Sequence, residues 1–157
     1  MILSEVLLES FNLIWDMYEA AIKQIKDDHW KTGDIDYLTP SRLMSHVVMS
    51  GDFYMGESRE FEWNRRFGSS PMDLPQDQLP SKKQVMEYHL DVKNKITNWL
   101  QSQDDEALIS RENVFTWTGS TRMSRVLYLL SHYRQHFGEL NAELRRRGLE
   151  RIKWKTY

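Results

Sequence analysis

The chain of 157 residues fits a single domain, residues 1–157, that is large enough to bury a core without disulfide bonds. Its 21 basic and 23 acidic side chains leave a formal net charge of -2, which argues against nucleic acid or anionic lipid as a general electrostatic partner. The absence of cysteine excludes a disulfide framework, a thiolate metal site and a cysteine nucleophile.

The first twenty residues are apolar, but they include Glu5, Glu9 and Asp16 and lack a basic leader, so they do not resemble a signal peptide. The longest apolar runs, such as residues 126–130, are too short to span a membrane. We therefore expect a cytoplasmic protein with no membrane association.

Two amphipathic helices are predicted in the N-terminal half, because apolar residues recur there at three- and four-residue steps. The first covers residues 3–28. The second begins at Thr39-Pro40, an N-cap followed by proline at the first helical position, and its apolar stripe predicts an end near Arg66.

A long linker separates the second helix from the third. Residues 67–80 include Gly68, Pro71, Pro75 and Pro80, and the segment is long for a turn between helices. At roughly 3.3 Å per residue it can run back along the whole bundle. Such a linker permits the second and third helices to be parallel instead of forming a hairpin.

The C-terminal half predicts two further helices. One starts after Ser81, and the other opens near Ser120 and stops at Gly148, a typical C′ glycine after three arginines. Between them, residues 104–119 are expected to form an extended loop, since a short strand-like stretch there has no clear partner. Four amphipathic helices predict an all-α four-helix bundle.

Three histidines are the candidate metal ligands. His132 and His136 stand four residues apart, which places their imidazoles on one face of the fourth helix, close enough to share an ion. Both lie on the same flank of that helix's apolar stripe, and His46 holds a similar position on the second helix. The three can converge in a crevice open to solvent, or they can be ordinary histidines at the core boundary.

Two segments carry a resemblance to a known family. They are Leu43-Met44-Ser45-His46-Val47 in the second helix and, in the fourth, the run LLSHYRQHFGEL of residues 129–140 with residues 144–148. In these motifs, and in helix count and linker placement over nearly the whole chain, the protein resembles the DinB-like superfamily of metalloenzymes. The resemblance implies an up-down-down-up four-helix bundle, with one divalent ion held by His46, His132 and His136.

The chemistry of such a centre can be narrowed. Three imidazoles leave an ion, which could be zinc, nickel or iron, at least one open position, as in catalytic sites. Tyr133 stands where HExxH metalloproteases carry their general-base Glu, so peptidase chemistry is not expected. The resemblance favours transfer of a low-molecular-weight thiol to a small-molecule electrophile. The alternatives are a metal-dependent hydrolase of a small substrate and a stress-associated bundle that binds metal without turnover.

Other polar residues carry weaker signals. His89 lies on the inner stripe of the third helix, as either a partner of the metal ligands or a core histidine. His29 and the arginines at 145–147 suit helix C-termini, although the arginines could instead bind an anion. Glu57 lies about 16 Å beyond His46 along a helix, which is too far for a metal ligand.

Aromatic residues are plentiful for so polar a chain. Near the histidine-bearing faces, Phe53, Tyr54 and Tyr133 could wall an apolar electrophile, but core packing is the expected use. We also expect a homodimer, because one small core has no evident place for three of the tryptophans, namely Trp15, Trp63 and Trp99.

Overall fold

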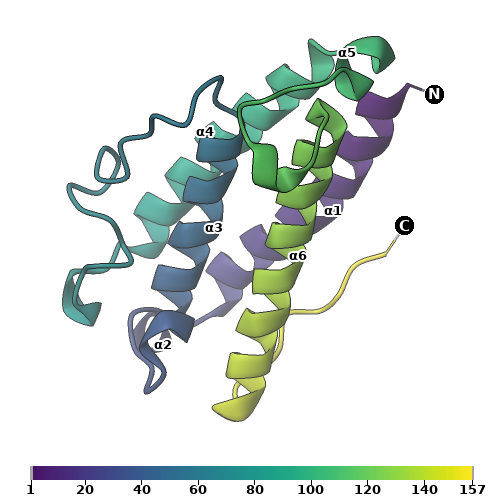
Figure 1. Ribbon diagram of the computed structural model, residues 1–157. Helices are drawn as coiled ribbons and strands as arrows, with labels where there is room; N and C mark the ends of the chain where they lie inside the picture. The colour runs from purple at the N-terminus through teal and green to yellow at the C-terminus, as the bar shows by residue number, and fades with distance from the viewer. Residues whose placement is uncertain (1, 157) are drawn as a thin grey trace.

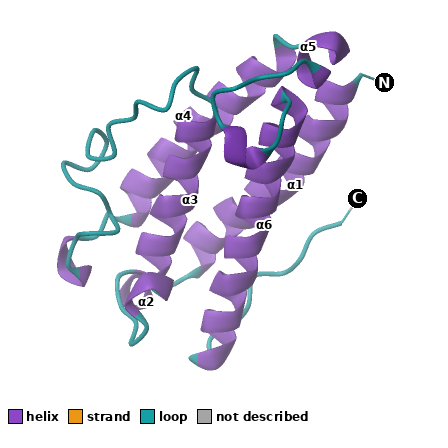
Figure 2. Cartoon of the chain, viewed as in Figure 1, coloured by secondary structure: helices purple, strands orange, loops and turns teal. Residues whose placement is uncertain are grey.

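The computed structural model describes residues 2–156, and within that range the chain is all-helical, with no β-strand (Figure 2). Four long helices pack side by side: α1 (Leu3–Gln24), α3 (Pro40–Tyr54), α4 (Lys82–Gln101) and α6 (Arg122–Arg146) (Figure 1). The short helices α2 (Asp27–Trp30) and α5 (Asp105–Ile109) lie in the connections. None of the helices in the described part has both the length and the apolarity that a membrane span requires. The expected all-α class is confirmed.

Aromatic side chains form the centre of the core between α1 and α6. The ring centroid of Tyr18 lies 5.4 Å from that of Tyr133 and 5.9 Å from that of Phe137. Trp15 is fully buried and stacks on Phe11 at 5.2 Å. The expectation that Trp15 has no place in the core is wrong, because α1 turns its indole inward.

The other two tryptophans expected outside the core, Trp63 and Trp99, do lie at the surface. Trp99 is half-buried beneath the guanidinium of Arg125, which lies 4.9 Å from its ring, and Trp63 is 42% exposed. The homodimer stays a prediction, with less support than the sequence suggested.

The first helix is shorter than predicted, because α1 ends at Gln24 and not at residue 28. Ile25 takes an extended backbone conformation, and its carbonyl accepts a hydrogen bond from Nζ of Lys82 at 2.6 Å. The helix resumes as α2, where Trp30 is buried and donates from Nε1 to the carbonyl of Pro80 at 2.9 Å. The apolar spacing continues through the break because Ile25 and Trp30 are both core residues.

The second helix is also shorter than predicted, since α3 ends at Tyr54 and not near Arg66. Gly56 and a run of charged residues follow, and the connection to α4 therefore spans residues 55–81. Phe61, which falls within the predicted helix, packs against Phe53 at 5.7 Å between ring centroids, but it does so from this connection. The apolar spacing indicated burial correctly and helix incorrectly.

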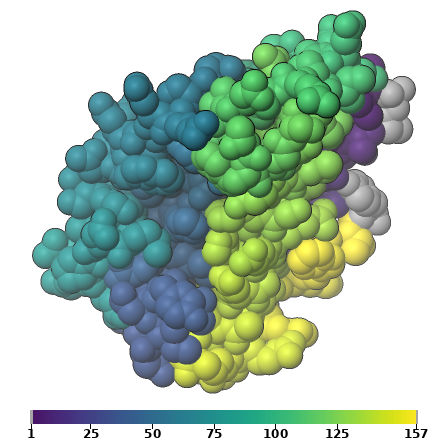
Figure 3. Space-filling model, viewed as in Figure 1, coloured from purple at the N-terminus to yellow at the C-terminus, as the bar shows by residue number. Residues whose placement is uncertain are grey.

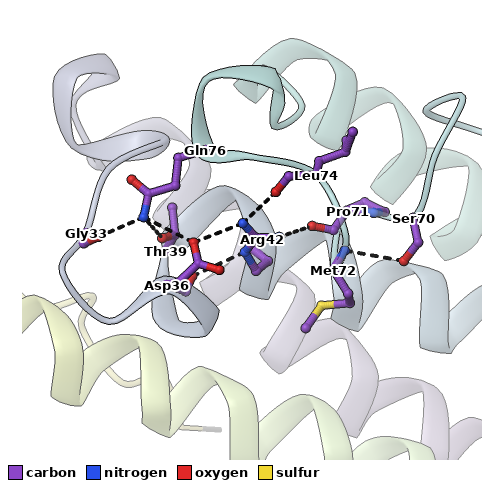
Figure 4. A network of polar contacts seen from close by, with 9 residues as sticks. All are labelled: Gly33, Asp36, Thr39, Arg42, Ser70, Pro71, Met72, Leu74 and Gln76. Atoms are coloured by element: carbon purple, nitrogen blue, oxygen red, sulfur yellow. Dashed lines mark hydrogen bonds and ion pairs between the residues drawn. The ribbon is translucent and has the colours of Figure 1, made fainter.

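Arg42 fastens the long connection to the start of α3 (Figure 4). Its buried guanidinium donates to the carbonyls of Pro71 and Leu74, the latter at 2.7 Å, and pairs with the carboxylate of Asp36 at 3.0 Å. Gln76 donates to the same carboxylate at 3.2 Å. These bonds hold the connection and the loop before α3 in one arrangement.

The predicted loop at residues 104–119 contains more helix than expected. It begins with α5, which Asp104 caps by accepting a bond from the backbone of Ala107 at 2.7 Å, and it ends with a 3-10 turn, Thr116–Thr118. The capping signal at Asp104 was present in the sequence, but five residues are too few to show periodicity.

Arg125, buried in α6, holds this loop against the end of α3. Its Nε pairs with the carboxylate of Glu112 at 3.0 Å, and its Nη1 donates to the carbonyls of Tyr54 and Gly56 at 3.1 and 2.9 Å. The remaining predicted helix ends are confirmed. Ser81 and Thr121 are N-caps of α4 and α6, and Gly148 follows α6 with φ 69°.

Candidate metal centre

The structure brings the three predicted histidines together. His46 projects from α3, and His132 and His136 project from α6. The imidazole centroid of His46 lies 5.2 Å from that of His132 and 5.0 Å from that of His136, and the latter two are 4.4 Å apart. One ring nitrogen of each lies within 4.8 Å of the other two. Within residues 2–156, no second group of three or more metal-ligating side chains converges in this way.

Close packing of α3 and α6 makes this convergence possible. Gly51 lies five residues beyond His46 in α3, and a Cβ added there would come within 2.5 Å of the hydroxyl of Tyr133 and 2.9 Å of a Val92 methyl group. A larger residue at position 51 would therefore push α3 away from α4 and α6. That displacement would separate His46 from the histidines of α6.

A carboxylate orients one of the imidazoles. Nδ1 of His136 lies 2.6 Å from Oε2 of Glu139, which follows it by three residues in α6. A carboxylate accepts a bond only from a protonated Nδ1, so this contact leaves the Nε2 lone pair of His136 free to face the cluster. Sequence reasoning missed Glu139, although a Glu three residues after a helical His is a recognisable signal for such a pair.

The donor geometry fits a shared ion. Nε2 of His136 and Nε2 of His132 lie 3.0 Å apart. Two nitrogens at about 2.0–2.1 Å from one tetrahedral zinc are separated by roughly 3.3 Å. Nδ1 of His132 is buried and has no hydrogen-bond partner among the described residues, so no protein group competes for the orientation of this ring.

The surroundings of His132 and His46 favour the neutral form of these two imidazoles. Burial lowers the pKa of His132 to about 3, and the neighbouring His136 and His46 add to this shift. Burial, followed by the proximity of His136, also lowers the pKa of His46, while Glu139 opposes the change. Neutral imidazole is the form that binds metal, so at pH 7 these two ligands need not release a proton.

The cluster is open to solvent on one side. All three histidines are half-buried, and the His136 side chain is 14% exposed. In the space-filling view α3 (dark blue) lies recessed between the 55–81 connection and α6 (Figure 3). On the inner side Tyr133 is fully buried, as a core residue and not as a wall of the site. The exposed parts of the three histidines therefore belong to the α3–α6 surface.

His89 does not belong to this cluster. It lies on α4 and faces α1, where its Nε2 is 3.4 Å from a carboxylate oxygen of Glu19. Of the two alternatives that the sequence left open, the structure favours the core histidine, and burial lowers its pKa to about 4.

The remaining candidates also lie elsewhere. His29 is part of α2, with Nδ1 3.1 Å from a guanidinium nitrogen of Arg147. Arg146 pairs with Glu143 at 2.7 Å, so Arg146 and Arg147 make contacts within the protein. Glu57 is exposed and accepts a bond from Nε1 of Trp99 at 3.3 Å.

Comparison of the chain with protein-family models, with curated proteins and with solved structures gives no match. The resemblance to the DinB-like superfamily therefore stays a prediction that rests on the two histidine motifs. What the structure contributes is the three-histidine group itself, which could hold a metal ion.

Proposed function

We propose that the protein is a DinB-like metalloprotein that binds one divalent ion through His46, His132 and His136. The observation that carries this proposal is the convergence of three imidazole nitrogens within 4.8 Å of one another, at a place open to solvent. All-nitrogen ligation suits zinc, nickel and iron, and fewer than four protein ligands leaves room for a substrate.

We further infer the up-down-down-up arrangement that accompanies this resemblance. Near the start of α3, Ser41 donates to the carbonyl of Pro80, just before α4, at 2.7 Å. Near the end of α3, Asp52 accepts bonds from Tyr88 at 2.7 Å and from Lys95 at 2.5 Å, further along α4. The start of α3 thus lies beside the start of α4, and the end of α3 lies beside residues further along α4. This order of contacts supports a parallel arrangement of the two helices.

We propose that the reaction is transfer of a low-molecular-weight thiol to a small electrophile. A bound divalent ion supplies Lewis acidity, which lowers the pKa of a thiol or a water molecule. The chain has no cysteine, so the sulfur must arrive with a cosubstrate. Glu139 is occupied by His136, and the position after His132 is the buried Tyr133. Water would therefore lack a free carboxylate base at these positions, whereas a thiol, being more acidic, needs none.

Metal analysis tests the binding part of the proposal. The protein should be purified without a histidine tag or a nickel column, analysed for bound metals, and then titrated with zinc after chelation. We expect one ion per chain in the wild type and none in the double variant His132→Ala, His136→Ala. The matched control is His29→Ala, which removes a histidine outside the cluster and should retain the ion. A double variant that keeps helicity and still holds one ion would contradict the proposal.

Product analysis tests the reaction. Metal-loaded protein is incubated with low-molecular-weight cellular thiols and model electrophiles, and thiol loss and conjugate are followed by mass spectrometry. We expect conjugate formation in the wild type and not in His46→Ala or chelated protein. Metal-dependent ester or amide hydrolysis without thiol use would select the hydrolase, and no reaction at all would favour the bundle without turnover.

A further inference from the structure

A row of aromatic rings leads away from the histidine cluster along the α3–α6 surface. Tyr128 precedes His132 by one turn of α6 and lies nearly parallel to its imidazole, at 18° and 6.4 Å between centroids. The Tyr128 ring is 5.3 Å from that of Tyr54, at the end of α3. Tyr54 in turn is 6.4 Å from Trp117, in the loop before α6. The rings thus form one continuous aromatic surface that begins at a candidate metal ligand.

Two of these rings are left uncovered by the core. Tyr128 is 37% exposed and Trp117 is 49% exposed, whereas Tyr54 is buried beneath them. Core packing accounts for Tyr54, but it does not account for the two outer rings. Exposed aromatic groups of this size beside a polar cluster typically mark a binding surface.

The exposed rings are held in place. Nε1 of Trp117 donates to the hydroxyl of Tyr54 at 3.0 Å, so the polar edge of the indole is satisfied within the protein. The loop that carries Trp117 is fastened by the buried pair of Arg125 and Glu112 at 3.0 Å. A preformed ring surface binds a ligand with little loss of side-chain entropy. The guanidinium of Arg59 lies over the Trp117 ring, 5.7 Å from its centroid, and the exposed remainder of the Tyr128 and Trp117 rings can receive an apolar, planar group.

We infer that Tyr128 and Trp117 form the wall of the substrate site, and that the electrophile carries an aromatic or other planar apolar group. This inference rests on the proposed function, because the histidine cluster would hold the reacting end of the same molecule. Of Phe53, Tyr54 and Tyr133, the rings that the sequence offered as a possible wall, two are core residues. Tyr133 and Tyr54 are buried, and Tyr128 follows the i, i+4 spacing of the histidines on α6.

A pair of small metal-binding probes tests the inference. Benzohydroxamate and acetohydroxamate share one metal-binding group, and only the first carries a ring. Their affinities for zinc-loaded wild type should differ by roughly tenfold or more in favour of the ring, as expected when an aromatic group is buried against other rings. Tyr128→Ala should bring this ratio to within about twofold. Trp117→Ala should lower it partly, and neither variant should change acetohydroxamate binding.

Three controls keep the test sharp. Trp154→Ala removes a tryptophan that is 50% exposed but packs on Phe137, outside the ring row, and should leave the ratio unchanged. Tyr128→Phe retains the ring and should preserve the ratio. Circular dichroism and zinc content should match the wild type in every variant.

The outcomes separate this inference from the proposed function. If wild type binds one zinc but both probes equally, or if the ratio survives in Tyr128→Ala and Trp117→Ala alike, the aromatic wall is not a substrate surface and the metal site stands. If no zinc binds, the proposed function fails and this inference with it. If light scattering shows a dimer that Trp117→Ala dissociates, with equal probe affinities, the rings are a contact between copies instead.

Discussion

The bundle encloses histidine in two places, and the two surroundings differ in what they bring together. Between α3 and α6, three imidazoles converge at a surface that solvent reaches. Between α1 and α4, His89 is fully buried, with a carboxylate oxygen of Glu19 at 3.4 Å. The ammonium of Lys93 lies 2.8 Å from that same oxygen. The first group, here called the open cluster (His46, His132 and His136), has three imidazole donors. The second, here called the closed group (His89, Glu19 and Lys93), has two donors and a cation that is already paired.

Burial alone does not distinguish these two groups. It lowers the pKa of His132 to about 3 and that of His89 to about 4, so a depressed pKa occurs at both. The difference lies in where the lone pairs point. Nε2 of His132 faces Nε2 of His136 at 3.0 Å, whereas Nε2 of His89 faces a carboxylate oxygen of Glu19 at 3.4 Å. Convergent donors with a route to solvent, and not perturbed ionisation, indicate a metal site.

The largest effect on zinc affinity is expected from removing one donor of the open cluster. His46→Ala should weaken zinc binding by more than about 100-fold, beyond the tenfold to hundredfold typical of losing an outer hydrogen-bond partner. The helix content should stay near wild type, because the His46 side chain is half-buried at the edge of the core. Isothermal titration with zinc measures the change. His89→Leu is the matched variant at the closed group, and zinc affinity equal to that of wild type is expected there; a similar loss in both variants would remove the distinction.

The next effect concerns Glu139, which orients His136. Glu139→Ala should reduce zinc affinity by about 10- to 100-fold, since an imidazole without its carboxylate partner loses its preferred orientation. Glu139→Gln, which can still accept the bond but lacks the charge, should fall between this variant and wild type. Nitrogen chemical shifts of the imidazole should show a changed tautomer population for His136 in the alanine variant.

Glu87→Ala, which removes an exposed carboxylate on α4, provides the control and should alter neither property. Unchanged shifts and unchanged affinity in Glu139→Ala would show that the contact with His136 is incidental.

The local part of the candidate site was predictable and its remote part was not. The pairing of His132 with His136 follows from helix geometry within four residues. Their meeting with His46 depends on the approach of α3 to α6, and hence on Gly51 fitting against Tyr133, which no local pattern in the sequence reports. The family resemblance supplied that long-range link.

Helix ends were missed for a different reason. Ile25 and Phe61 continue the apolar spacing of their helices, although both lie outside them. Apolar periodicity reports burial, and a connection that packs on the core buries side chains too. Tyr128 was not predicted as a site residue, because apolar stripes indicate buried positions and not exposed aromatic ones. Its four-residue spacing to His132 was nevertheless present in the sequence.

An effect of intermediate size is expected on the pH dependence of the free energy of unfolding, because His89 of the closed group is buried. The pKa of His89 is about 4 in the folded protein and near its ordinary value of 6.5 when unfolded. Between these two pH values the unfolded chain binds the His89 proton more strongly than the folded protein does. The contribution of neutral His89 to the free energy of unfolding is therefore fully present above pH 6.5 and is lost as the pH falls toward 4. Wild type should therefore lose about 2 kcal/mol between pH 7.5 and pH 5 that His89→Leu does not lose.

Urea unfolding of both chelated proteins at several pH values measures this difference. The open cluster also titrates, but it is common to both proteins and cancels in the comparison. Parallel pH profiles would show that His89 is not held neutral by burial.

The smallest effect is expected from Lys93→Met, which tests whether the closed group fails to bind metal because it has too few donors or because a cation is already paired there. Lys93→Met removes the ammonium, which lies over the Trp15 ring at 5.6 Å from its centroid, and keeps an apolar side chain of similar length. Because Lys93 and Glu19 are partly exposed, the loss of their ion pair should lower stability by only about 0.5–1 kcal/mol.

The informative measurement is zinc titration of Lys93→Met combined with His46→Ala, so that the open cluster is already impaired. Glu19 and His89 alone supply two donors, one fewer than the three protein ligands of catalytic zinc sites, and we expect no more zinc binding than in His46→Ala alone. If the combined variant instead gained one zinc per chain, the paired ammonium and not the shortage of donors would be what distinguishes the two histidine groups.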